Sequence, residues 1–252
     1  MKLLLDLGNT RLKWAMAAAG GWIARGAIAW EDDMSRALPK AWNGLGRPDR
    51  VLGASVVDGS REALIERIVA DVFRHDLAWV RTPAEGCGVR VAYAEPQRLG
   101  VDRFLAMVAA RAQGPASCVL AGIGTALTLD ALSAEGKHLG GLIAPGPQLM
   151  QQALLGATAR VRLDHPGQIR DVADNTADAV VSGCWQAVAA LIERFTKNLA
   201  GQHPDEAQHV LLDGGDAAAI LPLLTVPAEI AADSVLRGLL VWADSHLPHA
   251  SA

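Results

Sequence analysis

The chain opens with Lys2-Leu3-Leu4-Leu5-Asp6-Leu7-Gly8-Asn9-Thr10, an apolar run that ends in a glycine turn. A leucine-rich run of this length that stops at glycine predicts a buried β-strand. Apolar segments over residues 12–18 and 22–29 predict two further strands, so the chain is expected to begin as a meander of three strands. We take this first strand and its turn as the start of the fold.

The next segments predict a strand, helix, strand unit. Residues 51–57 and 77–80 are the two strand candidates, and the apolar side chains between them recur at helical spacing over residues 60–75. A further helix over 99–113 ends at Gly114-Pro115, where the pattern breaks. We therefore expect a domain boundary at this point.

After the break the pattern of strands and helices starts again. Its predicted elements are strands at 118–122, 126–132, 139–144 and 209–212, and helices at 147–155, 176–199 and 234–246. Both halves open with an apolar strand that runs into a glycine turn. The sequence thus predicts an α/β protein made of a duplicated unit, with domains over 1–114 and 115–252 and a cleft between them.

Composition excludes several classes of protein. The 252 residues are 51% hydrophobic, which is enough for a sizeable core, and the net charge of -4 comes from scattered charges that form no basic stripe for nucleic acid. The three cysteines lack the spacing of a zinc site or a disulfide framework. The first apolar run is too short for a secretion signal, and glycines and prolines interrupt the uncharged stretch 139–159. We expect a cytoplasmic protein with no nucleic-acid or membrane partner.

The turn Asp6-Leu7-Gly8-Asn9-Thr10 has the composition of a phosphate-binding loop. Glycine lets the backbone approach a phosphate, and main-chain N–H groups can donate to its oxygens. A carboxylate beside phosphates implies that Mg²⁺ lies between them, bound to Asp6 directly or through water. Taken alone, the pentapeptide is equally typical of an ordinary tight turn.

Two more glycine turns follow predicted strands in the second half. One is Gly122-Ile123-Gly124-Thr125, with Asp130 soon after, and the other is Asp213-Gly214-Gly215-Asp216. A second loop of this kind could hold a nucleotide from the side opposite to the first loop.

The segment Gly100-Val101-Asp102-Arg103 stands at the start of a predicted helix. An acid can accept the proton of a substrate hydroxyl, and an arginine can bind an anion, which suits phosphoryl transfer. Tyr93, the single tyrosine, lies on a loop just before this segment. Asn175-Thr176 precedes the long helix, where either residue could cap the helix or reach a substrate. Helix capping is the structural alternative for Asp102 too.

In their order along the chain, these motifs resemble the type III pantothenate kinases, a family within the superfamily of acetate kinases, sugar kinases, Hsp70 proteins and actin. The resemblance covers nearly the whole chain. It implies two ribonuclease H-like domains with a nucleotide cleft between them and a homodimer. It also implies ATP-dependent phosphorylation of pantothenate to 4'-phosphopantothenate, the first step of coenzyme A biosynthesis.

The resemblance also implies residue roles. Asp102 corresponds to the catalytic base. The implied pantothenate contacts are Tyr93, Gly100, Val101, Asp102, Arg103 and Thr176. The implied ATP contacts are Asp6, Leu7, Gly8, Asn9, Thr10, Arg11, Leu12, Lys13 and Thr125, with Mg²⁺ at Asp6.

One position departs from the family pattern. Members commonly carry an aspartate ahead of the Gly-Thr-Ala run that is associated with a monovalent cation, K⁺ or NH₄⁺. The equivalent position here is Ala121 or Gly122. A monovalent cation would therefore have to bind through backbone carbonyls or Asp130.

Two other functions stay open on the sequence. One is a non-catalytic regulatory protein on the same scaffold, because some relatives were named as accessory factors for gene expression. The other is a kinase for a different small hydroxyl compound. The presence of Asp6, Asp102 and Arg103 favours catalysis.

Overall fold

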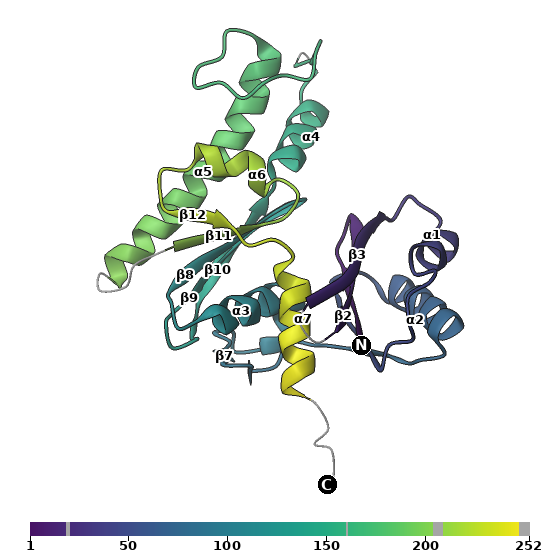
Figure 1. Cartoon of the computed structure of the whole chain (residues 1–252). Coiled ribbons are helices and arrows are strands. Elements are labelled where there is room, and N and C mark those ends of the chain that lie inside the picture. Colours follow the sequence, from purple (N-terminus) through teal and green to yellow (C-terminus); the bar gives the residue numbers. More distant parts are fainter. Residues whose placement is uncertain (19–20, 160, 204–208, 247–252) are drawn as a thin grey trace. The chain divides into compact units, whose positions relative to one another are not determined.

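The computed structural model describes residues 1–18, 21–159, 161–203 and 209–246 (Figure 1). The chain divides into two compact units. Unit 1 contains Met1–Gly114 together with the final helix, and unit 2 contains Pro115–Asp233. Within the described residues, no helix is long and apolar enough to span a membrane.

Unit 1 is built on a five-stranded sheet in the order β3-β2-β1-β4-β5. The strands are β1 (Lys2–Leu7), β2 (Arg11–Ala18), β3 (Gly21–Ala29), β4 (Arg50–Ser55) and β5 (Leu77–Trp79). Strand β2 runs antiparallel to its neighbours β1 and β3, and β4 and β5 continue the sheet in parallel with β1. This arrangement confirms both the predicted meander and the strand, helix, strand unit.

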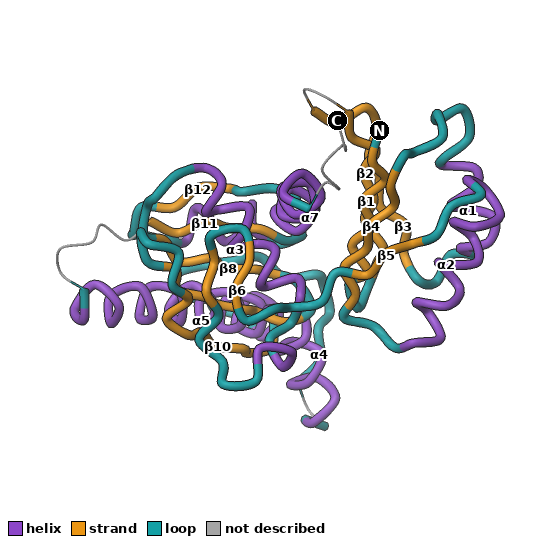
Figure 2. The backbone as a smooth tube through the Cα atoms, turned by 90° about the horizontal axis from the view of Figure 1, so that it is seen from below, coloured by secondary structure: helices purple, strands orange, loops and turns teal. Residues whose placement is uncertain are grey.

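Helices cover both faces of this sheet, as Figure 2 shows. They are α1 (Met34–Ala41), α2 (Gly59–Phe73), α3 (Val101–Gln113) and α7 (Ser234–Ser245). One face forms a core with α1 and α2, to which β1 contributes Leu3, Leu5 and Leu7. On the other side α7 packs against β1, β4 and α3. The remaining short elements are β6 (Glu85–Gly86), β7 (Val89–Arg90) and the 3-10 turn η1 (Pro96–Arg98).

Unit 2 repeats the strand order of unit 1, as β10-β9-β8-β11-β12. Its strands are β8 (Cys118–Ile123), β9 (Ala126–Leu132), β10 (His138–Pro145), β11 (His209–Asp213) and β12 (Ala228–Ile230). Its helices are α4 (Pro147–Ala157), α5 (Thr176–Gln202), α6 (Ala217–Ile220) and the 3-10 turn η2 (Leu221–Leu223). The strands again comprise an antiparallel meander followed by two parallel strands. The shared order supports the predicted duplication.

Several details differ from the sequence-based expectation. The short elements β6, β7, α6 and β12 were not predicted, because each has too few residues to show a period. Helix α1 has no counterpart in the prediction, because its eight residues contain Pro39, which reads as a breaker. The predicted second domain, residues 115–252, includes α7, whereas in the structure α7 belongs to unit 1 and packs against α3. Residues 247–252 of that range lie outside the described residues.

The contact between α3 and α7 depends on Gly238. A Cβ at this position would overlap the backbone carbonyl of Leu105 on α3. Only glycine therefore lets the two helix backbones approach this closely.

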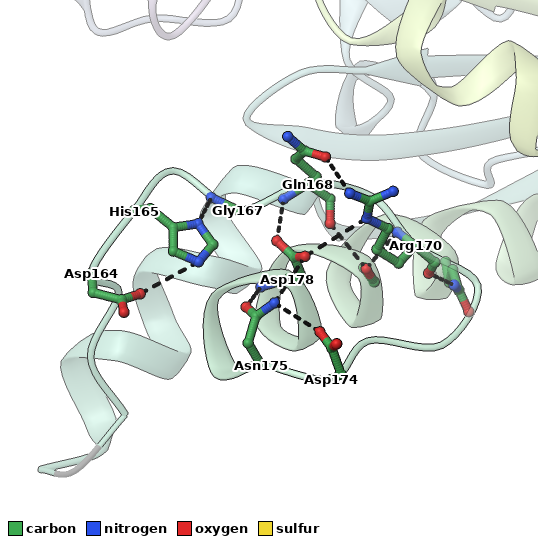
Figure 3. A network of polar contacts seen from close by, with 10 residues as sticks. Asp164, His165, Gly167, Gln168, Arg170, Asp174, Asn175 and Asp178 are labelled. Carbon is green, nitrogen blue, oxygen red and sulfur yellow. Dashed lines mark hydrogen bonds and ion pairs between the residues drawn. The ribbon is translucent and has the colours of Figure 1, made fainter.

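A segment ahead of α5 is bound to the first turns of that helix (Figure 3). We call residues 165–175 the strap. The Asp178 carboxylate on α5 accepts hydrogen bonds from the Gln168 N–H at 2.7 Å and from the Asn175 side chain at 3.0 Å. The Arg170 guanidinium lies 3.7 Å from the same carboxylate. These hydrogen bonds, with that of Asn175 the largest cause, lower the pKa of Asp178.

The next turn of α5 binds the strap as well. The Ser182 hydroxyl accepts from the Arg170 N–H at 2.8 Å, and the Gln186 side chain donates to the Arg170 carbonyl at 2.7 Å. Gly167 has a φ of +72°, and a Cβ there would lie 2.7 Å from the Ala177 carbonyl. The strap thus follows the helix surface at a distance that only glycine permits at this point.

Replacing Gly238 with alanine should destabilise unit 1. The added methyl group forces α3 and α7 apart, and overpacking of this kind costs roughly 1–3 kcal/mol. Urea unfolding measures the change. Gly183 is the matched control, because it lies in α5 with open space around it, so alanine there should stabilise the helix by up to about 1 kcal/mol. Equal effects at the two positions would contradict the close packing of α3 on α7.

The Asp178 network predicts a pH dependence. Because the pKa of Asp178 is lowered from 3.8 in the folded protein, its stabilising effect is complete above that value and is lost as the pH falls through the folded pKa. The melting temperature of Asp178→Asn should therefore lie below that of the wild type at neutral pH. This difference should shrink on acidification below about pH 4. Asp171→Asn, at an exposed position of the strap, is the control, and a gap that does not depend on pH would contradict the assignment.

Candidate active site

The predicted phosphate loop leaves the sheet at the end of β1. Asp6 is 9% exposed, and because side chains alternate along a strand, it lies on the face opposite to Leu5 and Leu7. That face is the one against which α7 packs. Asp6 pairs in register with Lys13 of β2 and Ala54 of β4, so its backbone is fixed on both sides.

The loop itself is a tight turn between β1 and β2. The Gly8 N–H donates to the Arg11 carbonyl at 3.1 Å. Asn9, Thr10 and Arg11 are exposed, whereas Leu7 and Leu12 are completely buried. The two leucines can offer a nucleotide only main-chain groups, so the exposed side chains of the predicted ATP segment are those of Asn9, Thr10 and Arg11.

The start of α3 brings together the predicted substrate residues of unit 1. Gly100 is the N-cap of the helix, and the Asp102 carboxylate accepts from the Arg103 N–H at 2.8 Å. Arg103 is only 6% exposed, and its guanidinium donates to the Tyr93 hydroxyl at 3.3 Å. The Arg103 main chain thus contacts the Asp102 carboxylate and its guanidinium contacts the Tyr93 phenol, and Val101 beside them is buried.

The second predicted loop connects β8 to β9 in unit 2. The Gly124 N–H donates to the Ala126 carbonyl at 3.1 Å, and Thr125 is exposed at the tip of the turn. The loop occupies the place in unit 2 that the Gly8 loop occupies in unit 1, since each follows the central strand of its sheet. The two loops are therefore structural equivalents.

Three glycine turns of unit 2 meet at this loop. The Gly146 N–H donates to the Thr125 carbonyl at 2.9 Å, and a Cβ on Gly146 would overlap the Gly124 carbonyl. Gly214, with a φ of +106°, lies equally close to the Ile123 carbonyl. The three turns therefore pack backbone against backbone, and this close packing needs glycine at Gly146 and Gly214.

Two side chains at these turns are absent from the sequence-based site. Gln148, near the start of α4, donates to the Asp216 carboxylate at 2.8 Å and joins the turn before α4 to the turn after β11. Gly146 and Gly214 were also not assigned to the site. The sequence does show that several strands end in a glycine turn. It does not show which of these turns meet, because that depends on the topology of the sheet.

Asp130 belongs to the interior of unit 2. Its carboxylate lies 2.9 Å from the Nε2 atom of His138, and both side chains are buried. Of Ala121 and Gly122, the two candidates for the position of the family's cation aspartate, Ala121 is buried and Gly122 is half-buried, both within β8. The Asp130 carboxylate, which was the alternative ligand for a monovalent cation, is thus in contact with His138.

The two candidate residues before α5 have different roles. The Asn175 side chain caps the helix by accepting from the Asp178 N–H at 2.9 Å. Thr176 is the first helical residue and is exposed, so its hydroxyl is accessible. The structure thus decides between the two candidates for the cap in favour of Asn175.

Asp6 fits the chemistry of a magnesium nucleotide. No group of three or more His, Cys, Asp or Glu side chains that could hold a metal ion occurs in the part of the chain that the structure describes. Mg²⁺ usually keeps several waters and binds through one or two carboxylates together with substrate phosphates. A single carboxylate next to a phosphate loop matches that preference.

A surface hollow of about 400 Å³ lies elsewhere in unit 1. It is lined by the C-terminal ends of α1 and α2, with Trp42, Arg47 and Arg74 among its residues. None of the predicted site residues lines it. The carbonyl ends of two helices disfavour an anion there, and Arg47 already donates to the Arg74 carbonyl at 2.9 Å. We do not assign this hollow to a nucleotide.

Solved structures similar to this chain agree on the fold. A Baf family protein from Campylobacter jejuni matches 96% of this chain and 98% of its own, with a TM-score of 0.61 and 17% identity. The activator of 2-hydroxyisocaproyl-CoA dehydratase from Clostridium difficile, solved with ADPNP, matches 100% and 99%, with a TM-score of 0.53 and 14% identity. At these identities the likeness shows the fold alone, that of actin-like ATPases and sugar kinases with two ribonuclease H-like units.

Curated relatives are similar in sequence over almost the full length. A type III pantothenate kinase from Aromatoleum aromaticum is 39% identical over 244 residues, which cover 96% of this chain and 98% of the relative. One from Xanthomonas campestris pv. campestris is 40% identical over 248 residues, covering 95% and 96%. The family model for type III pantothenate kinase matches residues 2–198. With the two glycine loops and the Asp102 cluster in place, this chain belongs to the type III pantothenate kinase family.

Proposed function

We propose that this protein transfers the γ-phosphoryl group of ATP to the primary hydroxyl of pantothenate, giving 4'-phosphopantothenate for coenzyme A biosynthesis. The observation that carries the proposal is the cluster at the start of α3, where Asp102, Arg103 and Tyr93 are neighbours. A protein that only bound a nucleotide would not need a carboxylate at this place. Its relatives named type III pantothenate kinase support the choice of substrate.

Asp102 is the general base in this proposal. Its carboxylate accepts the proton of the pantothenate hydroxyl as the oxygen attacks phosphorus, and the Arg103 N–H bond holds it in place. The carboxylate of pantothenate is an anion that guanidinium and hydroxyl donors can bind. We assign Arg103, Tyr93 and Thr176 to that role by their side chains, and Gly100 and Val101 by their main chain.

The two glycine loops bind ATP. Residues 6–13 of unit 1 and Thr125 of unit 2 supply N–H and hydroxyl donors for the phosphates. When bound at Asp6, Mg²⁺ neutralises the negative charge on the phosphate oxygens. The glycine turns at Gly146 and Gly214 pack directly against the backbone of the Thr125 loop and so support its conformation.

The active form is proposed to be a homodimer. Large apolar side chains of unit 2 are exposed on β10 and α4, namely Leu142, Ile143, Leu149 and Leu154. Exposed apolar groups of this kind are typical of surfaces that bind another protein. We place the reaction in the cytoplasm, where ATP is available. Neither a regulatory role nor another acceptor is favoured, because the curated relatives cited above are pantothenate kinases over their full length.

Replacing Asp102 with asparagine should abolish most of the turnover. Wild-type protein with Mg²⁺, ATP and pantothenate should form phosphopantothenate, and loss of the general base should lower kcat about 10²–10⁴-fold. The affinity for ATP, measured by calorimetry, should stay within twofold, since the base does not contact the nucleotide in this proposal.

Asp71→Asn on the outer surface of α2 is the matched control, because it makes the same chemical change at an exposed position. A wild type that fails to phosphorylate pantothenate but accepts another hydroxyl compound would overturn the substrate assignment. An active Asp102→Asn variant would overturn only the choice of base.

Asp6→Asn should change how the enzyme responds to magnesium. The neutral amide is a poorer ligand for a hard cation, so half-maximal activity should need a higher Mg²⁺ concentration, by about tenfold. A magnesium titration at fixed ATP measures the shift, with Asp71→Asn again as the control. An unchanged magnesium dependence would rule out a role of Asp6 at the metal.

A further inference from the structure

Trp30 contacts the phosphate loop at two points. It follows β3 directly, and its main-chain N–H donates to the Thr10 carbonyl at 3.2 Å. Its indole Nε1 donates to the Gly8 carbonyl at 2.7 Å. Two carbonyl groups of the turn are therefore bound by a single residue that is 22 positions from Gly8 in the chain.

The indole bond fixes which way a loop peptide faces. A trans peptide is planar, with its C=O and N–H directed to opposite sides. Because the Gly8 carbonyl points to the indole, the N–H of Asn9 in the same peptide points away from it. Rotation of this peptide would present a carbonyl oxygen instead, which repels phosphate, whereas N–H groups in a turn attract it.

The indole ring is itself held in place. The Arg61 guanidinium lies 4.8 Å from the ring centroid, within the range of a cation–π interaction. Arg61 stands in the first turn of α2, where Asp58 caps the helix and accepts from the Arg61 N–H at 3.2 Å. The ring also packs against the core cluster of unit 1. The loop is thereby tied to α2 through Trp30.

We propose that Trp30 is a positioning residue for phosphoryl transfer, which orients the Gly8–Asn9 peptide so that its N–H faces the nucleotide phosphates. This inference depends on the proposed function, in which residues 6–13 bind ATP. Trp30 acts through the loop and does not need to contact the substrate. The alternative is a purely structural role, in which the Trp30 ring only packs against the core.

Three variants separate the two roles. Trp30→Phe keeps an aromatic ring but removes the donor. Trp30→His restores a ring N–H, since Nε2 of histidine lies the same number of bonds from Cβ as the indole Nε1. Trp22→Phe, at the start of β3, removes an indole N–H away from the loop and is the matched control.

Trp30→Phe should weaken MgATP binding about 3- to 10-fold, the loss expected for one oriented hydrogen bond. The KM for ATP should rise by the same factor, while kcat at saturating ATP and the affinity for pantothenate stay within about twofold. Trp30→His should recover most of the ATP affinity, and Trp22→Phe should match the wild type. Calorimetry, steady-state kinetics and the melting temperature of the ligand-free protein give these values.

The outcomes distinguish this inference from the proposed function. If the wild type phosphorylates pantothenate and Trp30→Phe binds ATP normally, the positioning role is wrong and the function stands. Equal losses in Trp30→Phe and Trp30→His, together with a lower melting temperature in both, would assign the ring to packing alone. A wild type that binds no ATP would overturn the function and this inference together.

Discussion

The central strand of each sheet is the constraint on which the rest of the structure depends. In unit 1, β1 is hydrogen-bonded to β2 on one side and to β4 on the other, and Leu3, Leu4 and Leu5 are completely buried. A strand fixed by ladders on both edges and by packing on both faces cannot shift its register without exposing its apolar side chains. The glycine turn that leaves it is therefore held at one place, and β8 does the same for the loop of Thr125 in unit 2.

The two units use this constraint in different ways. Unit 1 adds chemistry from side chains, because α3 presents Asp102 and Arg103 on its first turn, where Tyr93 meets the guanidinium. Unit 2 adds closely packed backbone, because Gly146 and Gly214 approach the Gly122–Thr125 loop so closely that no side chain would fit. The same strand order thus supports a group of polar side chains at the start of α3 in one copy and close packing of backbone turns in the other.

Side-chain hydrogen bonds to the main chain hold two further segments in place, the Gly8 turn in unit 1 and the strap in unit 2. Trp30 holds the carbonyls of the phosphate loop, and the Asp178 carboxylate holds the strap ahead of α5. In each case one buried or half-buried polar group satisfies main-chain groups that would otherwise need water. Preorganisation of this kind suits phosphoryl transfer, which depends mainly on positioning and electrostatics.

The sequence by itself determined the local elements and the chemical residues. The bounds of β1 and β9 and the start of α5 follow from runs and periods of neighbouring apolar residues. Asp102 and Arg103 could be placed at a helix start because helix boundaries have local signals. Only the tertiary structure decided that α7 belongs to unit 1, that Asp130 faces His138, and that Trp30 binds the Gly8 carbonyl. These contacts join residues that are separated in the chain. A periodic pattern of apolar residues predicts a helix or a strand, but it does not predict which carbonyl group or helix will lie next to it in the folded protein.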